Sequence, residues 1–165
     1  MKTIEDLTLH FLQDIYYAER QILKALPKMA KAAQSEQLKQ AFIHHREETE
    51  GQVERLQQVF EKLGKRARGV TCEAIQGLIE EGEEVVSDFE MGPVRDAGLA
   101  ACAQAVEHYE ISRYGTLVTW AEQLGYRTSV KLLKQTLAEE EKTDKALTQL
   151  AETVVNAEAM QQAAE

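Results

Sequence analysis

Residues 103–124 read AQAVEHYEISRYGTLVTWAEQL, a stretch in which acidic side chains occupy the apolar stripe of a helix. Steps of three and four residues connect Ala103, Glu107, Glu110, Tyr114 and Leu117, so the two glutamates share a helix face with apolar residues. An isolated ionised carboxylate is so costly to bury that it must be neutralised, paired or bound to metal. The stretch therefore predicts a core-facing helix that carries a polar site.

The same feature recurs in three other helical stretches of the chain. Each has apolar residues at steps of three and four, and each places polar, metal-binding types of side chain on that stripe. The residues concerned are Glu19, His45, Glu48, Glu140 and Asp144. Acids from four helices of one bundle need a common partner, and a pair of divalent metal ions is our leading interpretation.

Helix-start and helix-stop residues predict four long helices, at 4–33, 36–63, 93–124 and from Thr128 or Ser129 to about 155. Thr3 with Asp6 resembles a capping box, Ser35 can cap the second helix, and Gly64 and Gly125 are typical of helix ends. Pro27 lies inside the first stretch and is expected to kink or restart that helix. The fold class predicted is an all-α four-helix bundle.

The connection between the second and third helices is long, from Gly64 to Met91, whereas the others are short. Such a connection can carry the chain from one end of a bundle to the other, and residues 73–89 are expected to form a short fifth helix across the bundle. With 165 residues, the chain is expected to be one domain, residues 1–155, with a frayed tail at 156–165.

Composition argues against several classes of partner. The chain has 28 acidic and 19 basic residues, a net charge of −9, which disfavours nonspecific binding to nucleic acid or to an anionic membrane. No signal peptide or membrane span is predicted, and we expect a cytoplasmic protein. Cys72 and Cys102 have no CxxC spacing and are interpreted as ordinary apolar residues in a reducing compartment.

The spacing of the acids supports a site shared by two helical hairpins. Glu19 and Glu48 are 29 residues apart and Glu110 and Glu140 are 30 apart, so the chain is predicted to contain two similar halves that meet at mid-bundle. Oxygen-rich ligation with one imidazole suits iron or manganese better than zinc. The alternatives are solvated surface acids, a hydrogen-bonded core role for His45, and a supporting hydrogen bond rather than ligation from Gln52.

Five segments together resemble the YciF-like family of bacterial stress proteins, which belongs to the ferritin-like superfamily and is distantly similar to rubrerythrin. The segments are QDIYYAERQ (13–21), HHREETEGQVERL (44–56), CEAIQGLIEE (72–81), VEHYEISRYGTL (106–117) and LLKQTLAEEEKTD (132–144). The resemblance covers about residues 2–155. It implies a ferritin-like bundle with a fifth helix in its crossover, a cytoplasmic homodimer, and a stress-associated role.

The metal-binding pattern implied by rubrerythrin carries over only in part. Where di-iron relatives have Glu-x-x-His, this chain has Glu48 followed by Gln52 and Glu140 followed by Asp144, and His45 is the candidate for one missing imidazole. Redox chemistry with oxygen or peroxide is our leading functional hypothesis. The alternatives are a noncatalytic stress or partner-binding protein with a structural metal site, and iron storage or DNA shielding in a hollow shell.

Overall fold

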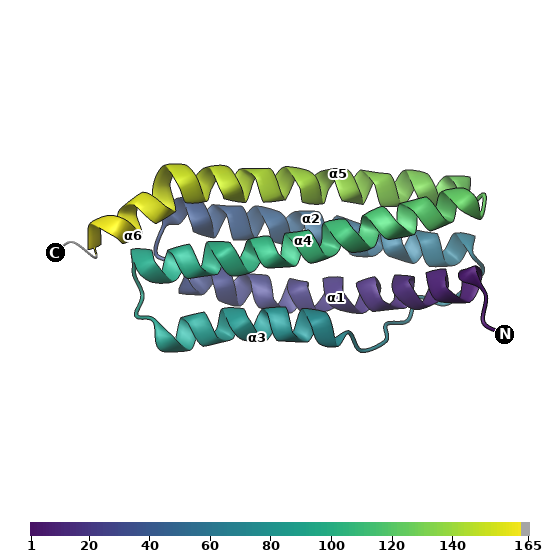
Figure 1. Cartoon of the computed structure of the whole chain (residues 1–165), viewed down its shortest axis with the longest axis horizontal. Helices are drawn as coiled ribbons and strands as arrows, with labels where there is room; N and C mark the ends of the chain where they lie inside the picture. Colours follow the sequence, from purple (N-terminus) through teal and green to yellow (C-terminus); the bar gives the residue numbers. More distant parts are fainter. Residues whose placement is uncertain (163–165) are drawn as a thin grey trace.

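A computed structural model describes residues 1–162 and shows four long helices packed side by side in one bundle (Figure 1). The helices are α1 (Ile4–Ala32), α2 (Glu36–Lys62), α4 (Pro93–Gln123) and α5 (Arg127–Leu150). Short turns join α1 to α2 and α4 to α5, and each pair is antiparallel (Figure 1). No strand occurs among residues 1–162, so the predicted all-α class is confirmed.

The ends of the first two helices follow the predicted capping residues. The backbone amide of Asp6 donates to the Thr3 hydroxyl and the Thr3 amide donates to the Asp6 carboxylate, which completes the capping box. Ser35 caps α2 through the amide of Leu38, and Gly64 follows α2 with a φ of 65°. These local signals therefore determine where the first hairpin begins and ends.

Pro27 does not restart α1, because the helix continues through it to Ala32. The proline lies at an exposed position of the helix, and Leu23, whose carbonyl would accept from a residue at position 27, is only partly buried. Water can bind a carbonyl left without its helical donor, which limits the cost of an internal proline. Of the two effects expected of Pro27, a kink or a restart of the helix, the restart does not occur.

The long crossover carries the chain back along the bundle, so that α2 and α4 run in the same direction (Figure 1). It contains α3 (Glu73–Asp88), which confirms the predicted fifth helix. This helix lies alongside α1 and α4, roughly parallel to them, rather than across the bundle as expected (Figure 1). Its apolar side chains therefore face the groove between these two helices.

Helix continues beyond α5 into the segment for which a frayed tail is predicted. After α5 comes one π-helical turn (Ala151–Val155) and then α6 (Asn156–Gln162), which packs against α4. Val155 is fully buried and anchors this segment to the bundle, which explains why helix continues beyond it. Residues 163–165 of the predicted tail lie outside the described residues.

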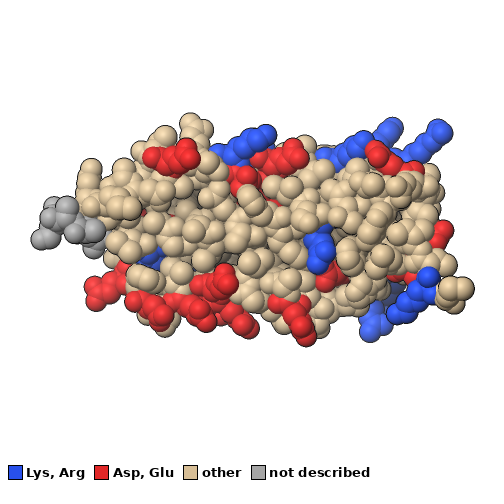
Figure 2. Space-filling view, in the orientation of Figure 1, with Lys and Arg blue, Asp and Glu red and all other residues tan. Residues whose placement is uncertain are grey.

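Most of the bundle core is apolar, and four fully buried glutamates lie within it. Its largest fully buried apolar side chains include Leu12, Ile15, Leu38, Phe42, Leu56, Phe60, Leu99 and Leu117. On the outside, acidic side chains gather over α3, at the lower left of Figure 2; its exposed acids are Glu73, Glu80, Glu81, Glu83, Glu84 and Asp88. Within residues 1–162, no helix combines the length and apolar character that crossing a membrane would require.

Candidate metal centre

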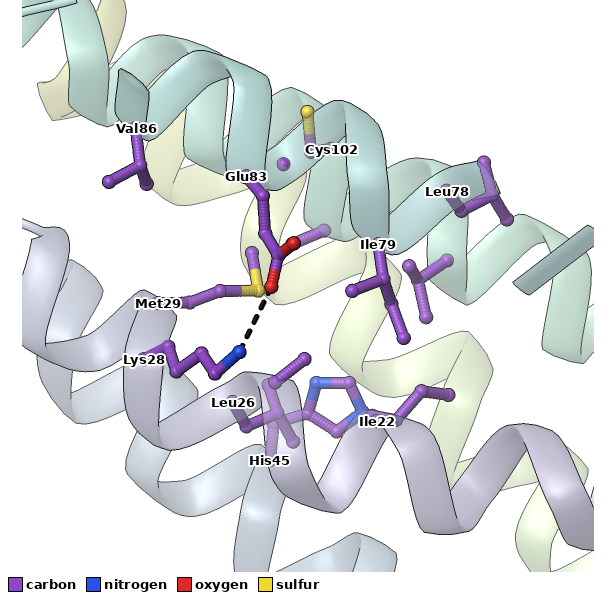
Figure 3. Close-up of a pocket in the computed structure, with 14 residues that line it drawn as sticks. Ile22, Leu26, Lys28, Met29, His45, Leu78, Ile79, Glu83, Val86 and Cys102 are labelled. Atoms are coloured by element: carbon purple, nitrogen blue, oxygen red, sulfur yellow. Dashed lines mark hydrogen bonds and ion pairs between the residues drawn. The ribbon is translucent and has the colours of Figure 1, made fainter. Parts of the chain in front are cut away.

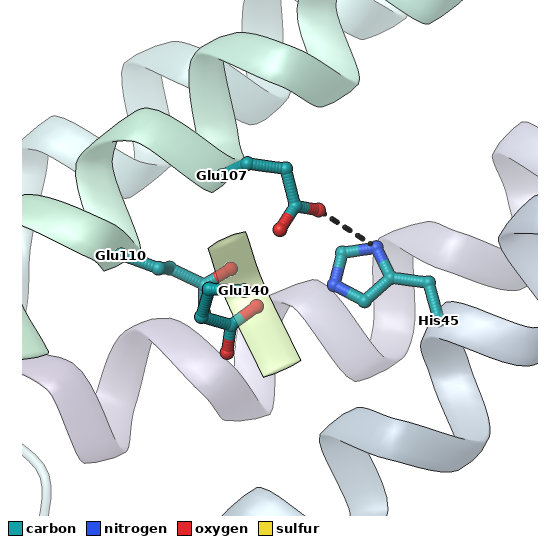
Figure 4. Close-up of side chains that lie close together, drawn as sticks. All are labelled: His45, Glu107, Glu110 and Glu140. Carbon is teal, nitrogen blue, oxygen red and sulfur yellow. Dashed lines mark ion pairs between the residues drawn. The ribbon is translucent and has the colours of Figure 1, made fainter. Parts of the chain in front are cut away.

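Four side chains from three helices meet inside the bundle (Figure 4). His45 comes from α2, Glu107 and Glu110 from successive turns of α4, and Glu140 from α5. Each offers one nitrogen or oxygen atom, and these atoms all lie within 4.8 Å of one another. Glu107 and Glu110 lie on one face of α4 because they are three residues apart.

The acids of this cluster are withdrawn from solvent and have no hydrogen-bond donor. Glu107, Glu110 and Glu140 are each 0% exposed. Both carboxyl oxygens of each side chain lack a hydrogen-bond partner within the part of the chain that the structure describes. Buried polar groups are almost always satisfied, so these oxygens need either protons shared between neighbouring carboxyls or a bound cation.

Burial and mutual repulsion favour the protonated form of these carboxyls in the metal-free protein. Burial raises the pKa of Glu107 to about 8, and the charges of neighbouring acids add to this rise. Burial also raises the pKa of Glu110 and Glu140 well above 4.5, and the neighbouring glutamates again contribute. A metal ion would reverse this preference, because carboxylates bind metal in their ionised form.

Glu19 adds a fourth fully buried acid, from α1. Burial raises its pKa to about 7, although a hydrogen bond donated by the Tyr114 hydroxyl opposes the rise. Its second carboxyl oxygen has no hydrogen-bond partner among the described residues. Tyr114 therefore fixes one oxygen of Glu19 and leaves the other free to bind a ligand.

His45 is the nitrogen donor of the cluster. Its side chain is 3% exposed, and burial lowers its pKa to about 4, so the imidazole is neutral near pH 7. Nδ1 lies 3.1 Å from Oε1 of Glu107, whereas Nε2 has no hydrogen-bond partner among residues 1–162. A neutral imidazole with a free nitrogen is in the protonation state that metal binding needs.

The two remaining predicted residues lie at the edge of the site. Glu48 is 16% exposed; it accepts a hydrogen bond from Thr143 (3.1 Å) and lies 3.4 Å from Nε2 of His44. Asp144 is 21% exposed and lies 3.1 Å from His108, with Gln104 donating to it at 3.3 Å. The structure does not bring either residue into the group of four, and both already have partners.

Sequence reasoning missed a polar layer beside the centre. Arg55 of α2 contacts Glu139 of α5 and donates to the hydroxyl of Thr136 at 3.0 Å. Gln52 also donates to Glu139, at 3.4 Å, which fits the supporting role considered for it rather than ligation. Arg55 lies one turn after Gln52, and Glu139 precedes Glu140, so a search of positions flanking the stripe would have found them.

The donor set of the cluster fits a metal ion. The cluster has the buried free atoms, the short separations and the mixture of carboxylate and imidazole that a metal ion requires. Carboxylate oxygens and one imidazole suit iron or manganese, and no thiolate lies in the group. The four helices of the bundle would hold such an ion away from bulk water.

Comparisons with known proteins agree with the fold and with the resemblance carried by the five sequence segments. Residues 3–160 match the family described as "Domain of unknown function (DUF892)". The chain is 54% identical over 160 residues to protein YciF of Escherichia coli K12, covering 96% of each chain. The predicted resemblance to YciF is therefore confirmed.

Solved structures show the same architecture. The crystal structure of the E. coli stress protein YciF has a TM-score of 0.90 at 55% identity, covering 94% of this chain and 99% of that one. YcfI of Rhodopseudomonas palustris has a TM-score of 0.87 at 52% identity, covering 89% and 94%. A Xanthomonas campestris protein shares the fold with a TM-score of 0.76 at 21% identity, covering 97% and 99%. The predicted ferritin-like bundle with a helix in its crossover is confirmed.

Proposed function

The chain belongs to the DUF892 family, and we propose that it is a stress-response protein whose bundle core holds two divalent ions of iron or manganese. The observation that carries this proposal is the group of fully buried, unpartnered carboxyl oxygens beside the free nitrogen of His45. A core made only for stability would not contain them, because burying polar groups without partners destabilises a fold. The stress role is proposed by analogy with the E. coli relative YciF, which is described as a stress protein.

The charge of the buried acids supports two ions rather than one. Glu19, Glu107, Glu110 and Glu140 are all 0% exposed, and when ionised they carry four negative charges. Two divalent cations would neutralise four carboxylates, while His45 adds a neutral donor. Glu48 and Asp144, at the edge, could join as further oxygen ligands if their present hydrogen bonds were exchanged.

The protein's own residues would hold the ions and control water and protons around them. Bound iron or manganese would supply electron-transfer chemistry with oxygen or peroxide. The Tyr114 hydroxyl orients Glu19, and the contact between Glu107 and His45 orients the imidazole. Arg55 places a positive charge near the acids and favours the ionised form of Glu19, whereas the negative charge of its partner Glu139 opposes this.

Elemental analysis of protein purified without added metal or chelator tests the metal site. We expect about two iron or manganese ions per chain. Glu140→Gln should lower this content strongly, because it removes a buried anionic ligand while preserving shape. Glu141→Gln, at the adjacent exposed position of the same helix, is the matched control and should keep the parent content. Equal metal content in all three proteins would refute the site.

A second measurement distinguishes redox activity from a noncatalytic role. The protein is loaded anaerobically with Fe(II), mixed with hydrogen peroxide or oxygen, and followed by absorbance. Oxidation faster than in the Glu140→Gln variant supports an oxidoreductase. Metal binding without accelerated oxidation supports the alternative, a noncatalytic stress or partner-binding protein with a structural metal site. The absence of Glu-x-x-His motifs from the sequence favours this alternative.

The resemblance also supports a homodimer, and the net charge of −9 disfavours nucleic acid or an anionic membrane as partner. Sedimentation measurements should give about twice the mass of one chain. A shell of many subunits would instead support the storage or shielding hypothesis.

A further inference from the structure

An apolar cavity of about 140 Å³ lies between α1, α3 and α4, next to the acidic cluster (Figure 3). Its wall is apolar apart from a few side chains, and Figure 3 shows the imidazole of His45 at its inner side, near Ile22 and Leu26. The principal lining residues are Ile22, Leu26, Leu78, Ile79, Val106 and His45. His45 therefore belongs both to the cavity wall and to the candidate metal centre.

The cavity exists because α3 covers the groove without filling it. Leu78, Ile79 and Val86 of α3 face the groove but are only partly buried, although side chains of this kind are usually fully buried. Small residues face them, including Ala25 and Ala103, and Gly82 contributes no side chain of its own. Unfilled apolar volume is destabilising because the lining atoms lose contacts, so an occupant would be favoured.

The size and charge of the surroundings define the class of occupant. An enclosed apolar cavity of roughly 150 Å³ binds benzene in another protein, and the cavity here has a similar volume but is partly open to solvent. Here the exposed face of α3 is acidic, and at the cavity Lys28 is already paired with Glu83 at 3.0 Å (Figure 3). An anionic ligand would meet negative charge and no free cation among the lining residues, so an uncharged molecule is favoured.

We infer that this cavity binds an uncharged, apolar organic molecule of about the size of one six-membered ring, with its inner end against His45. His45 lines the cavity and is 3% exposed, so the inner wall carries one buried polar side chain. That this molecule is a substrate of the metal centre rests on the function proposed above. That it binds in the cavity does not rest on that function.

Titration of the metal-free, full-length protein with benzene, followed by NMR, tests the inference. We expect saturable binding, with shifts confined to residues that line the cavity, and no binding of benzoate at the same concentrations. Ala25→Leu adds a side chain at a half-buried lining position and should weaken benzene binding at least about tenfold. Ala74→Leu, at an exposed position of α3 outside the cavity, should bind as the parent does.

Cys102 provides an independent readout, because it lines the cavity and is partly exposed. Benzene should slow its reaction with an apolar maleimide in the parent and not in Ala25→Leu. Absence of saturable binding, or binding and protection unchanged by Ala25→Leu, would overturn the inference. Glu140→Gln should lose metal but retain benzene binding. Failure of the metal proposal would therefore be seen in metal content, and failure of the cavity proposal in benzene binding.

Discussion

Replacing Glu19 by glutamine should change the free energy of unfolding of the metal-free protein, relative to the parent, in a pH-dependent way. The variant should gain stability over the parent between pH 4.5 and pH 8. Folding raises the pKa of Glu19 from 4.5 to about 7, with burial as the main cause. Each unit of difference between the folded and unfolded pKa corresponds to about 1.4 kcal/mol. Ionising this buried carboxyl therefore destabilises the folded state by about 3 kcal/mol. Glutamine keeps an oxygen for the Tyr114 hydroxyl and carries no charge.

The sign follows from the direction of the pKa shift. Below pH 4.5 Glu19 is protonated in both the folded and the unfolded chain, and no penalty exists. Between pH 4.5 and about 7 the unfolded chain loses its proton first, so parent stability falls; above pH 7 the loss is complete. The variant lacks this loss, so its stability relative to the parent should rise by about 3 kcal/mol between pH 4.5 and 8.

Urea unfolding at both pH values, in the presence of a chelator, measures this difference. Any pH-independent cost of burying the glutamine amide cancels when the two comparisons are subtracted. Glu54→Gln, at an exposed position of α2, is the control and should show little change. A relative stability of Glu19→Gln that is the same at both pH values would refute the reasoning, because Glu19 would then not be held protonated by burial.

Three further predictions concern other parts of the fold and the site. Asp96 is 2% exposed and accepts two backbone amides of the turn before α2, at 2.6 and 2.8 Å; Asp96→Ala should destabilise the protein by about 3 kcal/mol in urea unfolding. Tyr114→Phe removes the hydrogen bond that orients Glu19 and should weaken Mn²⁺ binding about tenfold or more by calorimetry. His45→Leu removes the only nitrogen donor of the cluster and should lower metal content towards one ion per chain, whereas His44→Leu, at the exposed neighbouring position, should not.

The sequence was most informative where one residue type decides local structure. The caps at Thr3 and Ser35 and the glycine after α2 placed helix ends within one or two residues. The stripe also identified Glu107 and Glu110, because α4 keeps a regular period through both. Residue type was sufficient for the helix ends and periodicity for the two glutamates, because neither requires knowing how neighbouring helices rotate.

Features that depend on helix rotation were less predictable. On α2 the residue beside Glu48 that is fully buried is Thr49, so a small rotation moves Glu48 to the edge of the site. On α5 the buried row passes through Thr136 and Glu140, which leaves Asp144 at the edge as well. A helix stripe has about one residue of uncertainty, and tertiary packing determines which neighbour is buried. The cavity beside α3 was not predictable for the same reason, because its volume depends on how closely that helix packs.

The positions of the donors argue that the two proposed metal ions would have different surroundings. The spacing of the acids predicts two similar halves, α1 with α2 and α4 with α5, but the halves differ one turn before their second acid. That position holds His45 on α2 and Leu137 on α5. One ion would therefore have an imidazole nitrogen among its ligands and the other only oxygen atoms. Imidazole and carboxylate ligands tune a metal differently. Because His45 also lines the apolar cavity, an ion bound beside His45 is the one that we expect to react with a molecule in the cavity.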